Sequence, residues 1–309
     1  MNKKNQNQQY NLTKTIIVIV VAIIFGILGI EKDNIQNILG DNLAITNSIK
    51  EATSFDKIQI ETGNSVISNI QNKVGNRVYF FDVGQADSIL VVNNGKTMLI
   101  DAGNNDDGDL IVKNIKKLGI SKIDYLIGTH PHEDHIGGLD NVINTFEIGN
   151  IFMPKVKTNT KTFEDVLDAI SNKGLKVKTP KIGDTFDVGD AKCEVMSIGE
   201  DTENLNETSI VIRIEYNDVS YLFTGDMEVS NESARNWPQT DILKVAHHGS
   251  STSTSANFLK QIMPKIAIIQ VGENNKYGHP HDVIIKRLKN IGAEIYRNDE
   301  KQTILIIQE

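Results

Sequence analysis

From residue 77 onward the sequence predicts an α/β domain in which two β-sheets pack face to face, with helices on their outer sides. Short apolar runs that are typical of buried strands recur along this region. They form a strand-rich block, then one helix, further strands, helices and strands again. This order suits two stacked sheets better than a doubly wound parallel sheet.

The turn and helix signals divide this region into elements. Strands at 89–92 and 97–100 flank a hairpin turn at 93–95, and a helix at 109–118 ends at Gly119. The other expected strands are 78–81, 125–127, 150–153, 193–196, 209–214, 219–223, 242–245, 266–269 and 303–307. The other expected helices lie near 162–172, 256–262 and 282–290.

Composition narrows the class of function. At 309 residues the chain can bury a substantial core, and its net charge is −8. An acidic protein is poorly suited to grip nucleic acid over a broad basic surface, so an anionic substrate needs a local positive centre such as metal ions. The single cysteine, Cys193, excludes an intrachain disulfide and is expected in the core.

The N-terminal region carries a membrane signal. Residues 1–14 are polar, with lysines and no acids, and 15–30 are almost entirely apolar. As a helix, 15–30 spans about 24 Å, somewhat less than a bilayer core of about 30 Å. It is a transmembrane anchor or a signal segment, and the lack of a small-residue cleavage site after Ile30 favours the anchor.

The lysines predict a cytoplasmic tail at 1–14 and an extracytoplasmic remainder, in a single-pass protein of the cell membrane. A secreted protein is the alternative. Residues 31–75, rich in Asn, Gln, Ser and Lys, are expected to form a stalk or linker. This leaves 76–309 as the folded domain.

One loop concentrates side chains that bind metals. His130, His132 and His135 lie within six residues together with Asp134, directly after an apolar strand. Imidazole and carboxylate groups bind Zn²⁺, Mn²⁺ or Fe at hydrolytic sites. The glycine pair at 137–138 is expected to let the backbone turn sharply into the next helix.

Other candidate ligands also follow strands. Asp226 stands at the end of one expected strand, His247 and His248 at the end of another, and His279 and His281 in a later loop. All seven histidines therefore fall in three clusters, each beside a strand end or in a loop. A purely structural role for all of them is improbable.

The His-x-His-x-Asp-His pattern resembles the signature of the metallo-β-lactamase fold, an αββα four-layer sandwich. Five further sequence motifs are similar to motifs in the extracytoplasmic metallohydrolase domain of ComEC/Rec2-type competence proteins, and they also resemble motifs in secreted phosphorylcholine esterases. These motifs are Asp82–Ser88, Leu99–Gly103, Leu222–Asp226, Leu243–Ser250 and Tyr277–Pro280. The resemblance covers about 77–309, and with one apolar segment the chain alone cannot form a multi-helix pore.

The resemblance implies two divalent transition-metal ions, with zinc expected and manganese as the alternative. One ion takes His130 and His132, the other takes Asp134 and His135, and Asp226 bridges them. A further ligand comes from His247 or His248, between which the sequence does not choose. The broader superfamily places another histidine before the bridging aspartate, but none occurs between His135 and His247, so one metal site is expected to be ligand-poor.

The remaining roles follow from the same resemblance. Asp101 and Asp82 are expected to support the ligands from outside, and Asp134 is expected to be catalytic as well as a ligand. His279 is a candidate for holding a substrate oxygen or protonating the leaving group. The expected substrate-binding residues are Asn206, Ser209 and Ser250. Backbone N–H groups of 250–255 receive a phosphate, or the serines cap the following helix.

The expected function is a membrane-anchored or secreted metal-dependent hydrolase, in which a metal-bound hydroxide cleaves phosphodiester bonds of DNA or of cell-wall phosphoesters. The resemblance to ComEC favours DNA as the substrate, whereas the net negative charge of the chain argues against it. One alternative is a surface binding module that uses metal for structure without catalysis. A β-lactamase-like hydrolase is the other.

Overall fold

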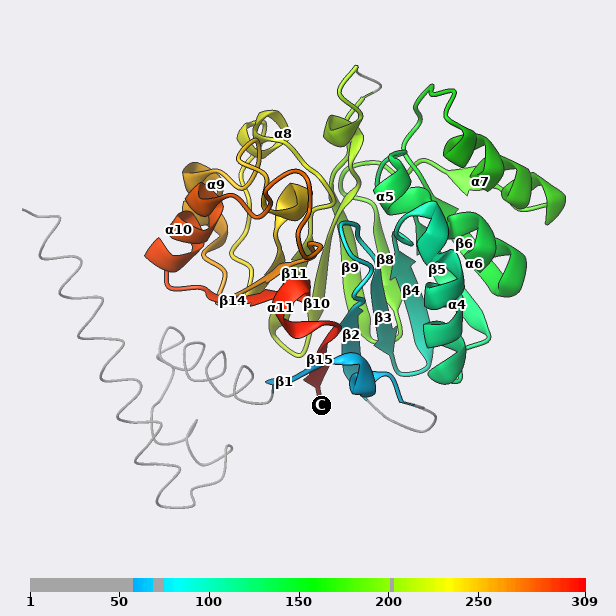
Figure 1. Cartoon of the computed structure of the whole chain (residues 1–309), viewed down its shortest axis with the longest axis horizontal. Coiled ribbons are helices and arrows are strands. Elements are labelled where there is room, and N and C mark those ends of the chain that lie inside the picture. The colour runs from blue at the N-terminus through cyan, green and yellow to red at the C-terminus, as the bar shows by residue number, and fades with distance from the viewer. Residues whose placement is uncertain (1–57, 69–74, 201–202) are drawn as a thin grey trace, which may run out of the picture. The chain divides into compact units, whose positions relative to one another are not determined.

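Two β-sheets lie face to face across the centre of the fold in a computed structural model that describes residues 58–68, 75–200 and 203–309 (Figure 1). The predicted cytoplasmic tail 1–14 and anchor 15–30 lie outside the described residues. Within the described ranges, every helix is too short or too polar to cross a bilayer.

Part of the predicted stalk 31–75 belongs to a sheet. β1 (Ile58–Thr62) pairs antiparallel with β15 (Ile304–Gln308), so the sheet begins before residue 76. Ile58 and Ile60 are half-buried, while the polar residues between and after them are exposed. Only two apolar residues mark this strand, which is too short an alternation to stand out in an Asn- and Gln-rich segment.

The first sheet has the order β1-β15-β2-β3-β4-β5-β6-β7. Its strands are antiparallel from β1 to β4 and parallel from β4 to β7. The remaining strands of this sheet are β2 (Asn76–Phe80), β3 (Ile89–Asn93), β4 (Lys96–Ile100), β5 (Lys122–Ile127), β6 (Glu147–Phe152) and β7 (Val177–Lys178).

The second sheet repeats this plan in the order β14-β13-β12-β11-β10-β9-β8. Its strands are antiparallel from β8 to β11 and parallel from β11 to β14. They are β8 (Thr185–Val188), β9 (Ala191–Ser197), β10 (Val211–Tyr216), β11 (Val219–Phe223), β12 (Ile242–Lys244), β13 (Ile266–Ile269) and β14 (Glu294–Arg297). Parallel neighbours need crossover connections, and the helices supply them.

Helices cover the outer sides of both sheets, as Figure 1 shows, so the predicted two-sheet α/β sandwich is confirmed. Beside the first sheet lie α4 (Gly108–Lys117), α5 (Glu133–Ile136), α6 (Leu139–Thr145) and α7 (Lys161–Asn172). Beside the second lie α8 (Val229–Ser233), α9 (Ala256–Ile262) and α10 (Asp282–Asn290), and α11 (Asn298–Lys301) joins β14 to β15.

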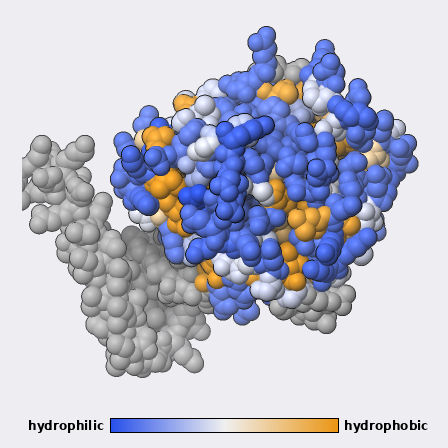
Figure 2. Space-filling view, viewed as in Figure 1, coloured by the Kyte–Doolittle hydropathy of each residue, from blue (hydrophilic) through white to orange (hydrophobic). Residues whose placement is uncertain are grey.

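Apolar side chains fill the spaces between these layers. Leu99 of β4 packs in one cluster with Ile115 of α4, and Leu243 of β12 packs in another with Phe258 of α9. Between the sheets, the rings of Phe80 and Phe223 lie 6.1 Å apart. The face of the molecule in Figure 2 is mostly hydrophilic, with small scattered hydrophobic areas.

Candidate metal centre

Asp101 joins the end of β4 to the histidine loop. Its buried carboxylate accepts the N–H and the hydroxyl of Thr129, both at 2.7 Å, and lies 2.8 Å from Nδ1 of His135. Because β4 and β5 are parallel, their carboxyl ends reach the same edge of the sheet. Burial raises the pKa of Asp101, although the neighbouring His135 opposes that rise. With Nδ1 held, Nε2 of His135 faces the site.

The loop after β5 carries His130 and His132 toward each other. Nε2 of the fully buried His130 lies 3.0 Å from Nδ1 of His132 and 3.9 Å from Oδ2 of Asp226. On its other side, Nδ1 of His130 is 3.1 Å from the hydroxyl of Thr129 and 3.4 Å from that of Ser209. The Ser209 hydroxyl also accepts the backbone N–H of Asp226 at 3.1 Å. Ser209 thus contacts two candidate ligands.

The glycine pair forms the expected turn between α5 and α6, but the glycines answer a need for space rather than for unusual backbone angles. Gly137 has φ −54° and ψ −47°, and Gly138 has φ −90°, both ordinary values for any residue. A Cβ on Gly137 would stand 2.2 Å from the backbone of Asn104 and Asn105, and one on Gly138 would stand 2.4 Å from the carbonyl oxygen of Ala102. The segment after β4 packs directly on the histidine loop.

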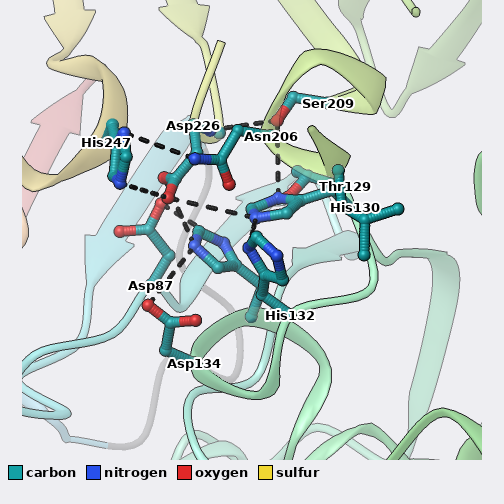
Figure 3. A network of polar contacts seen from close by, with 12 residues as sticks. Asp87, Thr129, His130, His132, Asp134, Asn206, Ser209, Asp226 and His247 are labelled. Atoms are coloured by element: carbon teal, nitrogen blue, oxygen red, sulfur yellow. Dashed lines mark hydrogen bonds and ion pairs between the residues drawn. The ribbon is translucent and has the colours of Figure 1, made fainter. Parts of the chain in front are cut away.

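Asp226 is the centre of the cluster, as Figure 3 shows. It follows β11, and its Oδ1 lies 3.3 Å from Nε2 of His135. Its Oδ2 lies 3.7 Å from Nε2 of His247 and 3.8 Å from Nε2 of His248. With His130, four imidazoles therefore surround one carboxylate.

These residues fit a divalent metal ion. The ligand atoms of Asp134, His135, Asp226 and His248 all lie within 4.8 Å of one another. Within the described part of the chain, Nε2 of His135 and Oδ1 of Asp226 are buried without a hydrogen-bond partner. An unpartnered buried polar atom is costly, and a metal ion would satisfy both. The mixed imidazole and carboxylate set suits zinc or manganese.

The charges of the cluster are arranged for a cation. Burial acts to raise the pKa of Asp226, but His135 and His248 outweigh it and hold that pKa well below its usual range. Burial likewise acts to lower the pKa of His135, but Asp226 and Asp101 raise it well above normal. Burial lowers the pKa of His130, which favours a neutral ring. Metal binding at such a site displaces protons from imidazoles.

The motif Asp82–Ser88 contains two carboxylates, and Asp87 rather than Asp82 contacts the cluster. Oδ1 of Asp87 lies 3.4 Å from Nδ1 of His248, and its other oxygen pairs with Lys244. Asp82 is only partly buried, and its backbone N–H donates to the hydroxyl of Thr303 at 3.2 Å. Asp82 and Asp87 are five positions apart in a loop, so either carboxylate could face the site, and the motif alone does not choose between them.

Two further groups behind the histidines were missed from the sequence. Nδ1 of His248 lies 2.9 Å from the carbonyl oxygen of Gln270, and Nδ1 of His247 lies 3.1 Å from Oε1 of Glu228. The amide of Asn206 donates to the same Glu228 oxygen at 3.3 Å. Asn206 thus lies beside the cluster with its amide nitrogen engaged, while its buried Oδ1 has no hydrogen-bond partner among the described residues. A backbone carbonyl leaves no signal in the sequence. Glu228 lies only two residues after Asp226, and nothing in the sequence marks it as a separate candidate.

The serine-rich segment after β12 is engaged within the protein. The N–H of Ser250 donates to the carbonyl oxygen of His247 at 2.7 Å, and that of Ser251 donates to Nδ1 of His281 at 2.9 Å. The hydroxyl of Ser255 caps α9 by accepting the N–H of Phe258 at 3.1 Å. The helix-capping alternative is therefore confirmed, and these two N–H groups are not open to a phosphate.

His279 lies at the outer side of the cluster. Its ring centroid is 5.6 Å from that of His247 and 6.4 Å from that of His248. Burial, with these two histidines next, lowers the pKa of His279 to about 4. Its Nδ1 lies 3.4 Å from Nε2 of Gln85. Gln85 can only donate from that atom, so Nδ1 accepts and Nε2 carries the proton.

A cleft of about 430 Å³ opens beside Asp134. Tyr277 lies on it with 54% of its surface exposed, and its ring stacks at 5.6 Å on that of His279. The cleft is lined by Gln85, Asn104, Glu133, Asp134, Asn275, Lys276 and Tyr277. Of these lining residues, only Asp134 belongs to the candidate ligand set.

Comparisons with known proteins agree with this geometry. Residues 81–273 match the family model of the metallo-beta-lactamase superfamily. ComE operon protein 3 of Bacillus subtilis is 34% identical over 60% of this chain and 25% of its own length. Recombination protein 2 of Haemophilus influenzae is 30% identical over 67% of this chain and 26% of its own length. The matches thus span about a quarter of these relatives.

A solved structure supports the fold alone. CmlA, a diiron β-hydroxylase from Streptomyces venezuelae, has a TM-score of 0.51 and 15% identity, over 75% of this chain and 54% of its own. The family match, the relatives and the four-layer arrangement confirm the resemblance to the competence-type proteins that the histidine loop indicated. This chain belongs to the metallo-beta-lactamase superfamily.

Proposed function

We propose that the chain is a metal-dependent hydrolase that cleaves phosphodiester bonds. The convergence of imidazoles and carboxylates on Asp226 supports this most directly, because His135 and Asp226 turn unpartnered buried atoms into the same space. Asp134, His135, Asp226 and His248 would hold one ion, and His130 and His132 would contribute to a second. A divalent ion held there would supply Lewis-acid chemistry, activating water for hydrolysis and stabilising charge on a phosphoryl oxygen.

His279 is proposed to bind the substrate, not a metal. Gln85 holds Nδ1, so the Nε2–H of His279 is free to donate to a substrate oxygen on the outer side of the cluster. A donor in this place stabilises negative charge as it develops on the reacting group. Tyr277 stacks on the His279 ring and restricts its tilt.

The cleft is not basic, since Glu133 and Asp134 line it together with Lys276. Lys276 lines it, and Nζ lies 5.1 Å from the centre of the Tyr277 ring. The net charge of −8 makes the metal centre the main attraction for a phosphate. DNA is the polymer in keeping with the names of the recombination and competence relatives, and a cell-wall phosphoester is the other candidate. Residues 15–30 are proposed to anchor the domain outside the membrane.

A substrate panel tests this function on the whole chain loaded with zinc or manganese. The substrates are bis(p-nitrophenyl) phosphate, a single-stranded oligonucleotide, p-nitrophenylphosphorylcholine and a chromogenic β-lactam. Hydrolysis of a phosphodiester by the wild type and not by Asp226→Ala is expected. Cleavage of the β-lactam alone would favour the lactamase alternative, and bound metal with no hydrolysis would favour the binding module.

A further inference from the structure

His247 and His248 adopt an uncommon backbone. Both lie in the left-handed region, with φ values of 50° and 51°. A residue other than glycine in this region costs on the order of 1–3 kcal/mol, and such strain gathers at functional sites. Here it brings two consecutive imidazoles to the same oxygen, since both Nε2 atoms lie within 3.8 Å of Oδ2 of Asp226.

Each of the two rings is also held from behind. Nδ1 of His247 faces the Glu228 carboxylate, and Nδ1 of His248 faces the Gln270 carbonyl. Both acceptors require a proton on Nδ1, which leaves the lone pair on Nε2 directed at Asp226. A histidine whose second nitrogen donates to a carboxylate or carbonyl has the arrangement of a metal ligand.

The two histidines differ in their neighbours. His248 is in the compact set with Asp134 and His135, and its Nε2 lies 3.2 Å from Asp134. His247 is not in that set. Both histidines border Oδ2 of Asp226, which also lies 3.9 Å from Nε2 of His130, but only His248 belongs to the compact set.

The side of the site that holds His130 and His132 has no third imidazole in the ligand set expected from the sequence. His130 and His132 are 3.0 Å apart at their facing nitrogens, and only Asp226 joins them from the second sheet in the set expected from sequence. No histidine occurs between His135 and His247 to supply another. His247 is the remaining imidazole that borders Asp226, the carboxylate shared with this side.

We propose that the consecutive pair is divided between two metal sites. In this arrangement His247 completes a site with His130, His132 and Asp226. The other site takes Asp134, His135, His248 and Asp226. Two adjacent residues in left-handed conformation thereby supply one imidazole to each site. The inference concerns metal content and does not depend on which ester the protein cleaves.

Metal content of single and double variants tests the division. The whole chain, loaded with zinc and freed of excess ion, is expected to hold about two ions, and His247→Ala and His248→Ala about one each. His130→Ala combined with His247→Ala is expected to keep about one ion, because both changes empty the same site. His247→Ala combined with His248→Ala is expected to lose both.

His281→Ala is the matched control. It removes an imidazole from the neighbouring loop whose Nδ1 is used by the N–H of Ser251, so the metal content should stay at the wild-type value. Circular dichroism verifies that each variant is folded. The division is wrong if His247→Ala keeps the wild-type content, if the His130 and His247 double variant loses all metal, or if the wild type holds one ion.

Glu228 gives a second and independent measurement. As the residue that positions His247, it should affect one ion only. Glu228→Ala is expected to weaken the affinity of one zinc ion by about 10–100-fold in a chelator competition. Glu228→Gln should retain near wild-type affinity, because its carbonyl oxygen still accepts from Nδ1 of His247. Equal weakening of both ions would point to general loss of structure and would contradict the assignment.

Discussion

Lys244 and Asp87 form an ion pair in which the two side chains are 0% and 2% exposed. Nζ of Lys244 also donates to the carbonyl oxygen of Gly225 at 3.2 Å and lies 4.0 Å from Oδ1 of Asp226. The other oxygen of Asp87 faces His248. A fixed ammonium therefore lies directly behind the central carboxylate, where it balances negative charge and holds Asp226 and His248 in place.

Removing this ammonium should be costly. Lys244→Met leaves Asp87 buried without its partner, and breaking a buried pair in this way costs about 3–5 kcal/mol. The loss should appear in urea unfolding of the metal-free protein, where ligand binding does not contribute. Adding Asp87→Asn to Lys244→Met should restore part of the stability, because the remaining amide is neutral. Additive losses in the double variant would contradict a direct ion pair.

Gly137→Ala should distort the histidine loop although its φ and ψ suit alanine. The new Cβ would meet the backbone of Asn104 and Asn105 at 2.2 Å, and overpacking of this kind costs about 1–3 kcal/mol. The melting temperature of the variant and its affinity for zinc should both be lower than those of the wild type. Ser171→Ala, on the exposed side of α7, adds no contact and should leave both near the wild-type values. If Gly137→Ala keeps the wild-type stability and zinc affinity, the histidine loop and the segment after β4 can move apart to make room for the added methyl group.

The sequence predicts best those elements whose apolar residues are continuous. The helices 256–262 and 282–290 and the strand 266–269 have the predicted bounds, because a complete buried face marks each of them. β7, β8 and β14 were missed because few of their residues are buried: β7 is fully exposed at the edge of its sheet, β14 has no buried residue and β8 has one. Weak burial leaves little apolar pattern to detect.

Some residues of the site can likewise be predicted from the sequence, and others cannot. The ligand types of the histidine loop could be read locally, since they lie within six residues after one strand. The Lys244 and Asp87 pair could not, because it joins two sheets and depends on how these sheets stack. The same holds for Glu228, which contacts His247 only because the chain between them, including α8 and β12, folds back on itself. Contacts of this kind require the folded chain.

Cys193 should be unreactive in the native protein. It is 2% exposed on β9, and burial raises the pKa of its thiol to about 12. Because the thiolate is the reactive form, a disulfide reagent such as DTNB at pH 8 should react very slowly. In denaturant the thiol should react at once with one equivalent of reagent. Rapid native reaction would show that this edge of the second sheet opens readily.

Asp226 and His279 are expected to affect hydrolysis in different ways. Asp226→Ala removes the carboxylate shared by all four surrounding imidazoles, so metal content and phosphodiesterase activity should fall together. Measuring both on one preparation makes the comparison direct. Wild-type metal content in Asp226→Ala would contradict the central position assigned to this carboxylate.

His279→Ala should instead keep the metal content near that of the wild type and lower kcat by about 10²–10⁴-fold, the range for a proton donor or a preorganised donor to developing charge. The reason is geometric, because Gln85 holds Nδ1 and leaves Nε2–H for the substrate. Gln85→Ala, which frees the ring, should lower kcat less than His279→Ala does. Loss of metal in His279→Ala would make His279 a ligand, and full activity with full metal would remove it from the reaction.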